Sequence, residues 1–423
     1  MINYRKALVL APMVRVSELP TRLLSLKHGA DLVWGPEIID KKIITCRREW
    51  NEKLKCVDFL EPNGKVVFRT CPEREKSRLV FQLGTANPDL AVQAAKVVAA
   101  DVAAIDVNSG CPKHFSIHSG MGAALLRTPD KLVNILTSLV REVGTPFNIA
   151  ISVKIRLLES EDSTAALVER LVKTGIKNLT LHCRTTPMRP RDPAIRDDGR
   201  LERVVQICRD AGVTCLINGD VEQRSPDLAD LMSRYDVDGA MIGRGAEANP
   251  SCFSDSPIPW YSIVHEFFTI CKEFDNHVVN TKFCLARMIP GKSPVYQKVA
   301  SSRSMDAIEE ALKGATKEAD DLIPKKGPAP VLNPLRAKAK DTAAEPSSDT
   351  KSSEKSAPPK EKQESAPAKA SEPATTEVET ASEEALTAAG VKRAASPGVS
   401  SPPEAKRPHV DEPPKPAAAA AAL

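Results

Sequence analysis

The sequence predicts a (β/α)8 TIM barrel, followed by a small helical domain and a disordered C-terminal tail. Eight apolar runs of strand length alternate with amphipathic stretches over roughly 245 residues, the typical length of this barrel. Each run ends in polar or glycine-rich residues, as expected where the carboxyl ends of barrel strands carry function. A doubly wound sheet is the alternative, but no glycine-rich dinucleotide fingerprint follows the first strand.

The predicted strands are short, contain β-branched residues and are bounded by Gly, Pro or polar residues. In chain order they cover residues 7–11, 31–35, 78–81, 102–107, 149–153, 178–181, 213–217 and 239–242.

The helices predicted between the strands carry apolar residues every three or four positions. They cover residues 89–100, 130–142, 164–174, 201–211 and 226–235. Three helices have a start signal in which a capping residue precedes Pro at the first helical position. These signals are Asn87-Pro88, Thr128-Pro129 and Ser225-Pro226.

Composition divides the chain into a barrel domain over 1–250, a helical domain over 251–319 and a tail over 320–423. Helical periodicity returns over 258–275, 280–288 and 305–317. No Phe, Tyr or Trp follows Tyr296, and Ala, Pro, Lys, Glu, Ser and Thr dominate the tail. Because such a segment buries too little apolar surface to offset its chain entropy, we expect it to be disordered.

Ten cysteines form no CxxC pair and no His/Cys cluster with zinc spacing, so we expect no metal site. No apolar run is long enough to span a membrane, and no signal peptide is evident. A reducing compartment, the cytosol or the nucleus, fits best. Lys392-Arg393 and Lys406-Arg407 fit a two-part nuclear import signal, although such doublets are common in disordered tails.

Basic residues are concentrated in one predicted loop and the start of its helix, although the net charge is only +4. A solvated surface is the simpler explanation, but a nucleic-acid backbone requires such clusters. The cluster consists of Arg184, Arg189, Arg191, Arg196, Arg200 and Arg203.

Cys111 is the strongest candidate for a reactive group, because Asn108-Ser109-Gly110-Cys111-Pro112 closes the fourth predicted strand. A thiol at a strand end points into the space where α/β proteins place their chemistry. A lone cysteine here is more often a small core residue. The polar signatures at the other strand ends favour the reactive interpretation.

The ends of the seventh and eighth strands predict a phosphate site. Asn218-Gly219-Asp220 and Gly243-Arg244 occur where barrels bind phosphate through backbone N–H groups, with Arg244 as a charged donor. Two ordinary glycine turns are the alternative. A phosphate here with a ring across the mouth describes flavin mononucleotide (FMN).

Three further strand-end side chains suit a flavin ring. Gln82 offers a donor and an acceptor to an imide edge. Lys154, at the end of the fifth strand, would stabilise negative charge on the N1 and O2 side of the ring. His182 would serve the flavin or the substrate, and a satisfied core histidine is the alternative.

These motifs together resemble the tRNA-dihydrouridine synthases. The resemblance rests on Ala-Pro-Met-Val, Asn-Ser-Gly-Cys-Pro-Lys, Val-Lys-Ile-Arg, His-Cys-Arg-Thr, Asn-Gly-Asp and Ile-Gly-Arg-Gly, in the order of the family's strands. It covers about residues 7–250, and residues 273–282 are similar to the eukaryotic branch that modifies the position-20 uridine of the D loop. Animal members of that branch carry a double-stranded-RNA-binding domain. None is evident here, as in fungal-type members.

The resemblance implies FMN as cofactor, NADPH or NADH as reductant and tRNA as substrate. Hydride would pass from the flavin to C6 of the uracil ring, and Cys111 would protonate C5. Asn108 and Arg184 match positions that face substrate or flavin, and Arg189 and Arg191 of the basic loop would contact tRNA. The positions matching the family's flavin site are Pro12, Met13, Val14, Gln82, Lys154, His182, Asn218, Gly219, Asp220, Gly243 and Arg244.

Two other functions remain open. A flavin barrel of the dihydroorotate dehydrogenase type would oxidise a free pyrimidine with a cysteine base, but has no use for arginine-rich loops. A non-catalytic RNA-binding protein on a degenerate barrel would not need Cys111, Lys154 or the phosphate-site glycines. Yellow colour in the purified protein separates both flavoenzymes from the scaffold.

Overall fold

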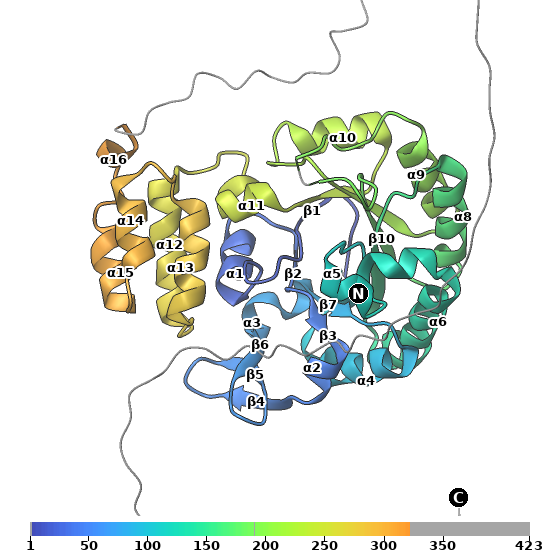
Figure 1. Cartoon of the computed structure of the whole chain (residues 1–423), viewed down its shortest axis with the longest axis horizontal. Coiled ribbons are helices and arrows are strands. Elements are labelled where there is room, and N and C mark those ends of the chain that lie inside the picture. Colours follow the sequence, from blue (N-terminus) through green and yellow to red (C-terminus); the bar gives the residue numbers. More distant parts are fainter. Residues whose placement is uncertain (1, 190, 322–423) are drawn as a thin grey trace, which may run out of the picture. The chain divides into compact units, whose positions relative to one another are not determined.

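The computed structural model describes residues 2–189 and 191–321. Figure 1 shows a barrel with a group of helices beside it. The described part ends with α16 (Lys317–Asp321), so nearly all of the predicted tail, 320–423, lies outside the described residues.

Eight parallel strands close into a ring, which confirms the predicted barrel. β2 pairs with both β1 and β7, and β1 pairs with β12, so the sheet has no free edge between its first and last strands. The strands are β1 (Ala7–Leu10), β2 (Leu32–Trp34), β7 (Leu79–Gly84), β8 (Ala104–Ser109), β9 (Ala150–Arg156), β10 (Asn178–His182), β11 (Thr214–Asn218) and β12 (Gly239–Ile242).

The strand register brings the predicted functional residues to one end of the barrel. Asn108 on β8 pairs with Lys154 on β9, and His182 on β10 pairs with Asn218 on β11. All four residues lie at or near the carboxyl ends of their strands, since parallel strands end at the same side of a barrel.

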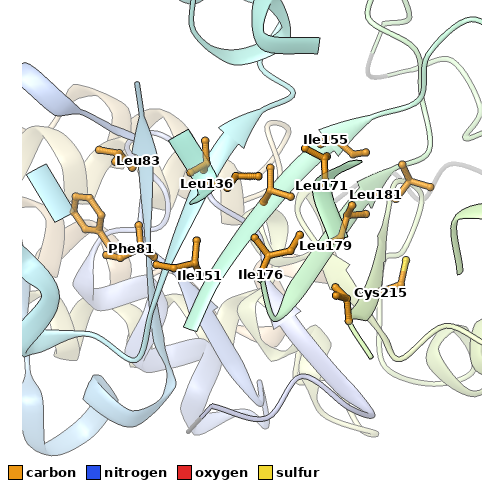
Figure 2. Close-up of a cluster of buried hydrophobic side chains, with 14 of the residues drawn as sticks. Phe81, Leu83, Leu136, Ile151, Ile155, Leu171, Ile176, Leu179, Leu181 and Cys215 are labelled. Atoms are coloured by element: carbon orange, nitrogen blue, oxygen red, sulfur yellow. The ribbon is translucent and has the colours of Figure 1, made fainter. Parts of the chain in front are cut away.

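The barrel strands are buried on both faces. Figure 2 shows Phe81, Ile151 and Leu179 among the side chains of a continuous apolar cluster. Leu136 of α6 (Pro129–Leu139) and Leu171 of α8 (Glu161–Val172) pack into the same cluster. Because helices cover the outside of the ring, its strands read as short apolar runs rather than alternating ones.

The other barrel helices are α4 (Pro88–Val98), α9 (Arg200–Asp210), α10 (Asp227–Tyr235) and the short α11 (Arg244–Ala248). Asn87 caps α4 as predicted, since its side chain accepts a hydrogen bond from the Leu90 N–H at 3.0 Å. Thr128 precedes α6 without a side-chain cap.

The predicted cap at Ser225 is wrong. α10 begins at Asp227, with Pro226 as the preceding residue. The Asp227 carboxylate accepts hydrogen bonds from the backbone N–H groups of Glu222 and Gln223, at 3.0 and 3.2 Å. A side chain that holds the preceding loop therefore takes the place of the predicted cap.

Sequence patterning missed α1 (Leu19–Lys27), because a buried arginine interrupts its apolar pattern. Arg22 is fully buried and donates to both carboxylate oxygens of Glu75 at 2.8 Å. Glu75 ends α3 (Pro72–Glu75), so this ion pair ties the first helix of the barrel to a segment fifty residues later. Such pairing satisfies charges that would otherwise be costly to bury.

A small antiparallel sheet between the second and third barrel strands was also missed. It consists of β4 (Arg47–Asn51), β5 (Cys56–Leu60) and β6 (Val66–Thr70). β4 is largely exposed and rich in charged residues, so it lacks the apolar pattern of a core strand. β3 (Ile38–Ile39) and α2 (Asp40–Ile44) lead into this insertion, and β3 pairs with β7.

The three helices predicted beyond the barrel are present as α12 (Trp260–Glu273), α13 (Val278–Met288) and α15 (Met305–Leu312). A fourth helix, α14 (Pro294–Ser301), was not predicted. Phe267, Leu285 and Ile308 belong to an apolar cluster shared by these helices and α1. The Asn280 side chain also donates to the Arg15 carbonyl at 2.6 Å, so α13 contacts the loop after β1. No helix in the described part is long and apolar enough to cross a membrane.

Candidate active site

A cavity of about 510 Å³ opens at the carboxyl ends of the barrel strands. Its volume lies within the range of about 300–1,000 Å³ that is typical of cofactor and ligand pockets. All of the predicted flavin positions line it, and so do Cys111, Asn108 and Arg184. Its lining also includes Glu37, Arg156, Lys113 and Glu247, which sequence reasoning did not assign.

The Cys111 turn is held in place by neighbouring side chains. The Asn108 Oδ1 atom accepts hydrogen bonds from the N–H groups of Gly110 and Cys111, at 3.0 and 3.1 Å. The Arg156 Nε atom donates to the Gly110 carbonyl at 2.7 Å. Gly122 approaches so closely that an added Cβ would lie 2.7 Å from the Cys111 carbonyl oxygen. The thiol therefore projects from a tightly constrained turn.

Cys111 is also among the most accessible cysteines of the chain. All ten cysteines are free thiols, and only Cys46 and Cys111 are partly exposed. Cys46 precedes β4, outside the cavity lining. A thiol is available to a ligand in the cavity only at Cys111.

Gln82 and Lys154 lie above a carboxyl group in the barrel interior. Asp106 is fully buried, and it accepts hydrogen bonds from Gln82 Nε2 at 2.9 Å and Ser152 Oγ at 2.7 Å. The Gln82 Nε2 group thus faces Asp106, and burial raises the pKa of this carboxyl. Burial, with a contribution from Arg156, lowers the pKa of Lys154 to about 8.

His182, Arg184, Asp220 and Arg244 form a second group on the opposite strands. Asp220 accepts hydrogen bonds from Arg184 and Arg244, the latter at 2.6 Å, so one carboxylate holds two guanidinium groups. Burial opposes ionisation of this carboxyl, but the Arg184 hydrogen bond holds the pKa of Asp220 below its usual value. Arg184 is buried, whereas about half of the Arg244 side chain is exposed.

His182 is a neutral imidazole in this environment. Burial, followed by the positive charges of Lys154 and Arg156, lowers the pKa of His182 far below its usual value. Its Nε2 atom lies 3.2 Å from an Arg184 nitrogen, which can only donate. His182 Nε2 is therefore the acceptor, and the proton resides on Nδ1.

The glycine of the seventh strand end has a backbone conformation that favours glycine. Gly219 has a φ of +113°, and a Cβ there would lie 3.0 Å from an Arg184 nitrogen. The neighbouring Asn218 side chain donates to the Met241 carbonyl at 2.9 Å, which ties this turn to β12. Gly243 is more open, with Ala11 and Met13 at ordinary contact distance.

Pro12, Met13 and Val14 form the wall of the cavity that follows β1. The Ser17 hydroxyl donates to the Ala11 carbonyl at 2.7 Å and lies 3.1 Å from the Met13 backbone nitrogen, which closes the loop on itself. Val14 lines the cavity and is 51% exposed.

Arg189 and Arg191 are placed differently from the other predicted site residues. Both are exposed in the loop between β10 and α9, and neither lines the cavity in the part of the chain that the structure describes. The Arg189 backbone N–H donates to the Asp192 carboxylate at 2.6 Å. These two arginines therefore border the site without entering it.

Glu37 and Arg156 show what sequence reasoning missed. Glu37 lies three residues after the end of the second barrel strand, and Arg156 ends the fifth, so both lie near the strand ends that identified the other residues. The same positional signal was available for them. No group of three or more His, Cys, Asp or Glu residues in the described part is arranged to hold a metal ion.

A larger hollow of about 640 Å³ lies elsewhere, between β6, the start of α1, the turn from α12 into α13 and the first residue of α15. Among the residues that line it are Lys65, Phe68, Asp275 and His277. It contains no strand-end residue of the barrel and no cysteine, so the smaller cavity is the better candidate for chemistry.

Comparisons with known proteins identify the family of the chain. The family model described as Dihydrouridine synthase (Dus) matches residues 9–315. The chain is 47% identical over 327 residues to a Schizosaccharomyces pombe protein named tRNA-dihydrouridine(20) synthase, with 76% of this chain and 67% of that protein covered. It is 46% identical over 355 residues to the Saccharomyces cerevisiae protein of the same name, with 80% and 91% covered. The chain belongs to the dihydrouridine synthase family.

Proposed function

We propose that this protein reduces the uridine at position 20 of tRNA to dihydrouridine, using NADPH or NADH as reductant and FMN as cofactor. The similar yeast proteins carry this activity and NAD(P)+ in their names. The observation that carries the proposal is the meeting of the Cys111 thiol with ring-binding and phosphate-binding side chains in one cavity.

The residues present fit FMN. Gln82, oriented by Asp106, presents amide groups for the imide edge of the ring, and Lys154 supplies positive charge. Arg244 and the backbone around Gly219 and Gly243 offer donors to a phosphate at the ends of β11 and β12. When bound, FMN would supply the hydride that C6 of the uracil accepts.

Lys154 acts as a charged group near neutral pH. With a pKa of about 8 it is mostly protonated at pH 7, although burial has weakened its hold on the proton. A buried cation is effective at stabilising nearby negative charge because little solvent screens it. His182, held neutral with its proton on Nδ1, can donate a hydrogen bond without adding charge.

Cys111 would supply the proton. As C6 accepts hydride, the electron pair of the C5–C6 double bond moves towards C5 and O4, and C5 requires a proton. A protonated thiol can act as a general acid. The constrained turn of Asn108 and Arg156 would aim the thiol at C5. The resulting thiolate takes up a proton from solvent before the next turnover.

The tRNA must present its uridine to a cavity that lies inside the barrel mouth. Extruding a base costs a few kcal/mol, which contacts to the rest of the RNA must offset. Exposed Arg189 and Arg191 at the rim would contact the phosphate backbone. The helices α12 to α15 would extend this surface, since α13 contacts the loop after β1 at the same mouth.

Reconstitution tests the proposal. The purified full chain is incubated with FMN, NADPH and an unmodified tRNA transcript, and nuclease fragments are weighed by mass spectrometry. We expect two added hydrogens at position 20 and no product from a transcript with cytidine there. Failure to retain flavin, or reduction of free uracil derivatives in preference to tRNA, would contradict the proposal.

A further inference from the structure

Arg15 is an exposed cation at the rim of the cavity to which the mechanism above gives no role. It directly follows Val14, the last residue of the cavity wall after β1. Its guanidinium carbon lies 3.9 Å from the centre of the Phe283 ring on α13. This group forms no hydrogen bond or ion pair within the described residues. A contact with an aromatic ring holds the charge in place but does not neutralise it.

A second arginine approaches the same ring. The guanidinium carbon of Arg287 lies 4.8 Å from the ring centre, one helical turn from Phe283 along α13. Its Nε atom lies 3.4 Å from the carboxylate of Glu247, which lines the cavity. Arg15, Phe283 and Arg287 thus form a guanidinium cluster beside the cavity. One carboxylate faces two guanidinium groups, so the cluster keeps a net positive charge.

The backbone of Arg15 is held in a left-handed conformation, with a φ of +70°. This conformation is uncommon for a residue with a long side chain and costs free energy. Two contacts with α13 maintain it. The Asn280 side chain donates to the Arg15 carbonyl oxygen at 2.6 Å, and the Cys284 thiol donates to the same oxygen at 3.4 Å. The helix therefore fixes where the Arg15 side chain leaves the loop.

The chemistry of the cluster suits a phosphate group. Guanidinium groups bind phosphate oxygens through charge-assisted hydrogen bonds. A uridine whose base enters the cavity leaves its own phosphates at the rim, where the cluster lies. The phosphates of NADPH offer the same chemistry. Phe283 and Arg287 lie on α13, outside the barrel, which favours a substrate that extends beyond the cavity.

We propose that the guanidinium cluster binds a backbone phosphate of the tRNA next to the uridine in the cavity, with Arg15 as the main contact. The inference rests on the function proposed above, which makes tRNA the substrate. The phosphate would supply the anionic partner that the Arg15 guanidinium lacks. It would also hold the RNA backbone at the point from which the base enters the cavity.

The affinity of the holoenzyme for an unmodified tRNA transcript, measured over a range of salt concentrations, tests the proposal. Arg15→Met keeps a long side chain over Phe283 but removes the charge. We expect affinity to fall about 3- to 10-fold at low salt, and the slope of log K against log salt to become shallower by about 1. Lys6→Met is the matched control. Lys6 is also exposed and left-handed, with a φ of +57°, but it precedes β1 at the opposite end of the barrel.

Two further variants separate phosphate binding from packing. Arg15→Gly removes the side chain, and glycine adopts the left-handed conformation without strain. We expect it to lose as much affinity as Arg15→Met, with flavin content and melting temperature near those of the wild type. Phe283→Leu keeps both charges, so it should weaken binding with little change in the salt slope. If Arg15 only covered Phe283, Arg15→Met would bind tRNA as Lys6→Met does, which would overturn the proposal.

A transcript with one neutral methylphosphonate linkage identifies the phosphate. Placed on one side or the other of position 20, the linkage should weaken binding to the wild type about as much as Arg15→Met does. Combined with Arg15→Met, it should cause little further loss, because both changes remove the same contact. A methylphosphonate in the anticodon stem serves as the control. Full additivity on both sides of position 20 would contradict the assignment.

Flavin reduction by NADPH and by NADH separates the two sources of phosphate. A higher KM for NADPH in Arg15→Met, with unchanged tRNA affinity, would assign the cluster to the reductant and overturn the proposal. The binding measurements do not require turnover. If the wild type forms dihydrouridine but Arg15→Met binds tRNA like its control, the inference alone fails. If the wild type forms no dihydrouridine at position 20, the proposed function fails.

Discussion

The protein has positive charge in two regions, which differ in burial and in hydrogen-bond partners. Lys154, Arg156 and Arg184 lie inside the cavity, where each is largely withdrawn from water and most are bonded to defined partners. Arg189 and Arg191 lie on the adjacent loop with their side chains exposed. The cavity group can bind individual atoms of a ligand. The loop arginines can attract a polyanion such as RNA through electrostatic interactions that salt screens.

The cost of burial explains the difference. Removing a charge from water costs free energy, which neighbouring groups offset when they pair with it. The pKa of Lys154 is lowered to about 8, so its neighbours offset only part of this cost. A buried charge that the protein compensates only in part is expected where a bound ligand supplies the remaining partner. An exposed arginine has no such desolvation cost, and each one that contacts a polyanion adds to the free energy of binding. We therefore assign the buried charges to the reaction and the exposed arginines to the binding of RNA.

The largest effect should come from Cys111→Ala. Flavin binding and reduction by NADPH should persist, while dihydrouridine formation falls by about 10²- to 10⁴-fold, the usual loss of a general acid. Single-turnover reoxidation of the reduced enzyme by tRNA measures the effect. Near-normal product formation by this variant would remove Cys111 from the mechanism.

Lys154→Met should have the next largest effect, and pH tests it without mutation. Loss of the buried cation should slow flavin reduction by about 10²-fold. In the wild type, Lys154 loses its charge as the pH rises through about 8, so reduction should slow over this range. The Lys154→Met variant should lack that pH dependence. A wild-type rate that rises or stays level above pH 8 would contradict the role of this charge.

The double variant Arg189→Ala/Arg191→Ala should have a smaller effect that depends on salt. Flavin content and reduction should be unchanged, because neither side chain lines the cavity. The affinity for tRNA should fall several-fold at low salt, and the slope of log K against log salt should become shallower by about 1 to 2. An unchanged slope would show that these arginines do not contact phosphate.

Cys46→Ala should have the smallest effect and sharpens the contrast with Cys111. Both thiols are partly exposed, but only Cys111 lies in the cavity. We expect rates of both half-reactions within about twofold of wild type, as for most surface substitutions. A defect as large as that of Cys111→Ala would mean that thiol accessibility, rather than placement at the barrel mouth, decides the phenotype.

Local signals predicted the barrel strands and most of the cavity. Cys111, Lys154 and His182 were found because each follows an apolar run, and the ends of parallel strands meet. Glu37 and Arg156 carry the same signal, but a lone acid or arginine after a strand has no distinctive chemistry. The sheet β4–β6 was missed because its first strand is charged and exposed. The helix α1 was missed because it contains the buried Arg22, whose partner Glu75 lies far along the chain.

The sequence by itself determined the fold class, the family and which strand ends carry polar chemistry. These features follow from residue periods and from motifs of a few neighbouring residues. Tertiary structure alone decided that Asp220 holds both Arg184 and Arg244, that Asp106 orients Gln82 and that His182 stays neutral. The physical reason is distance: Asp106 follows Gln82 by 24 residues in the chain but lies in hydrogen-bond contact with it. Charge and burial depend on such contacts, which no local pattern encodes.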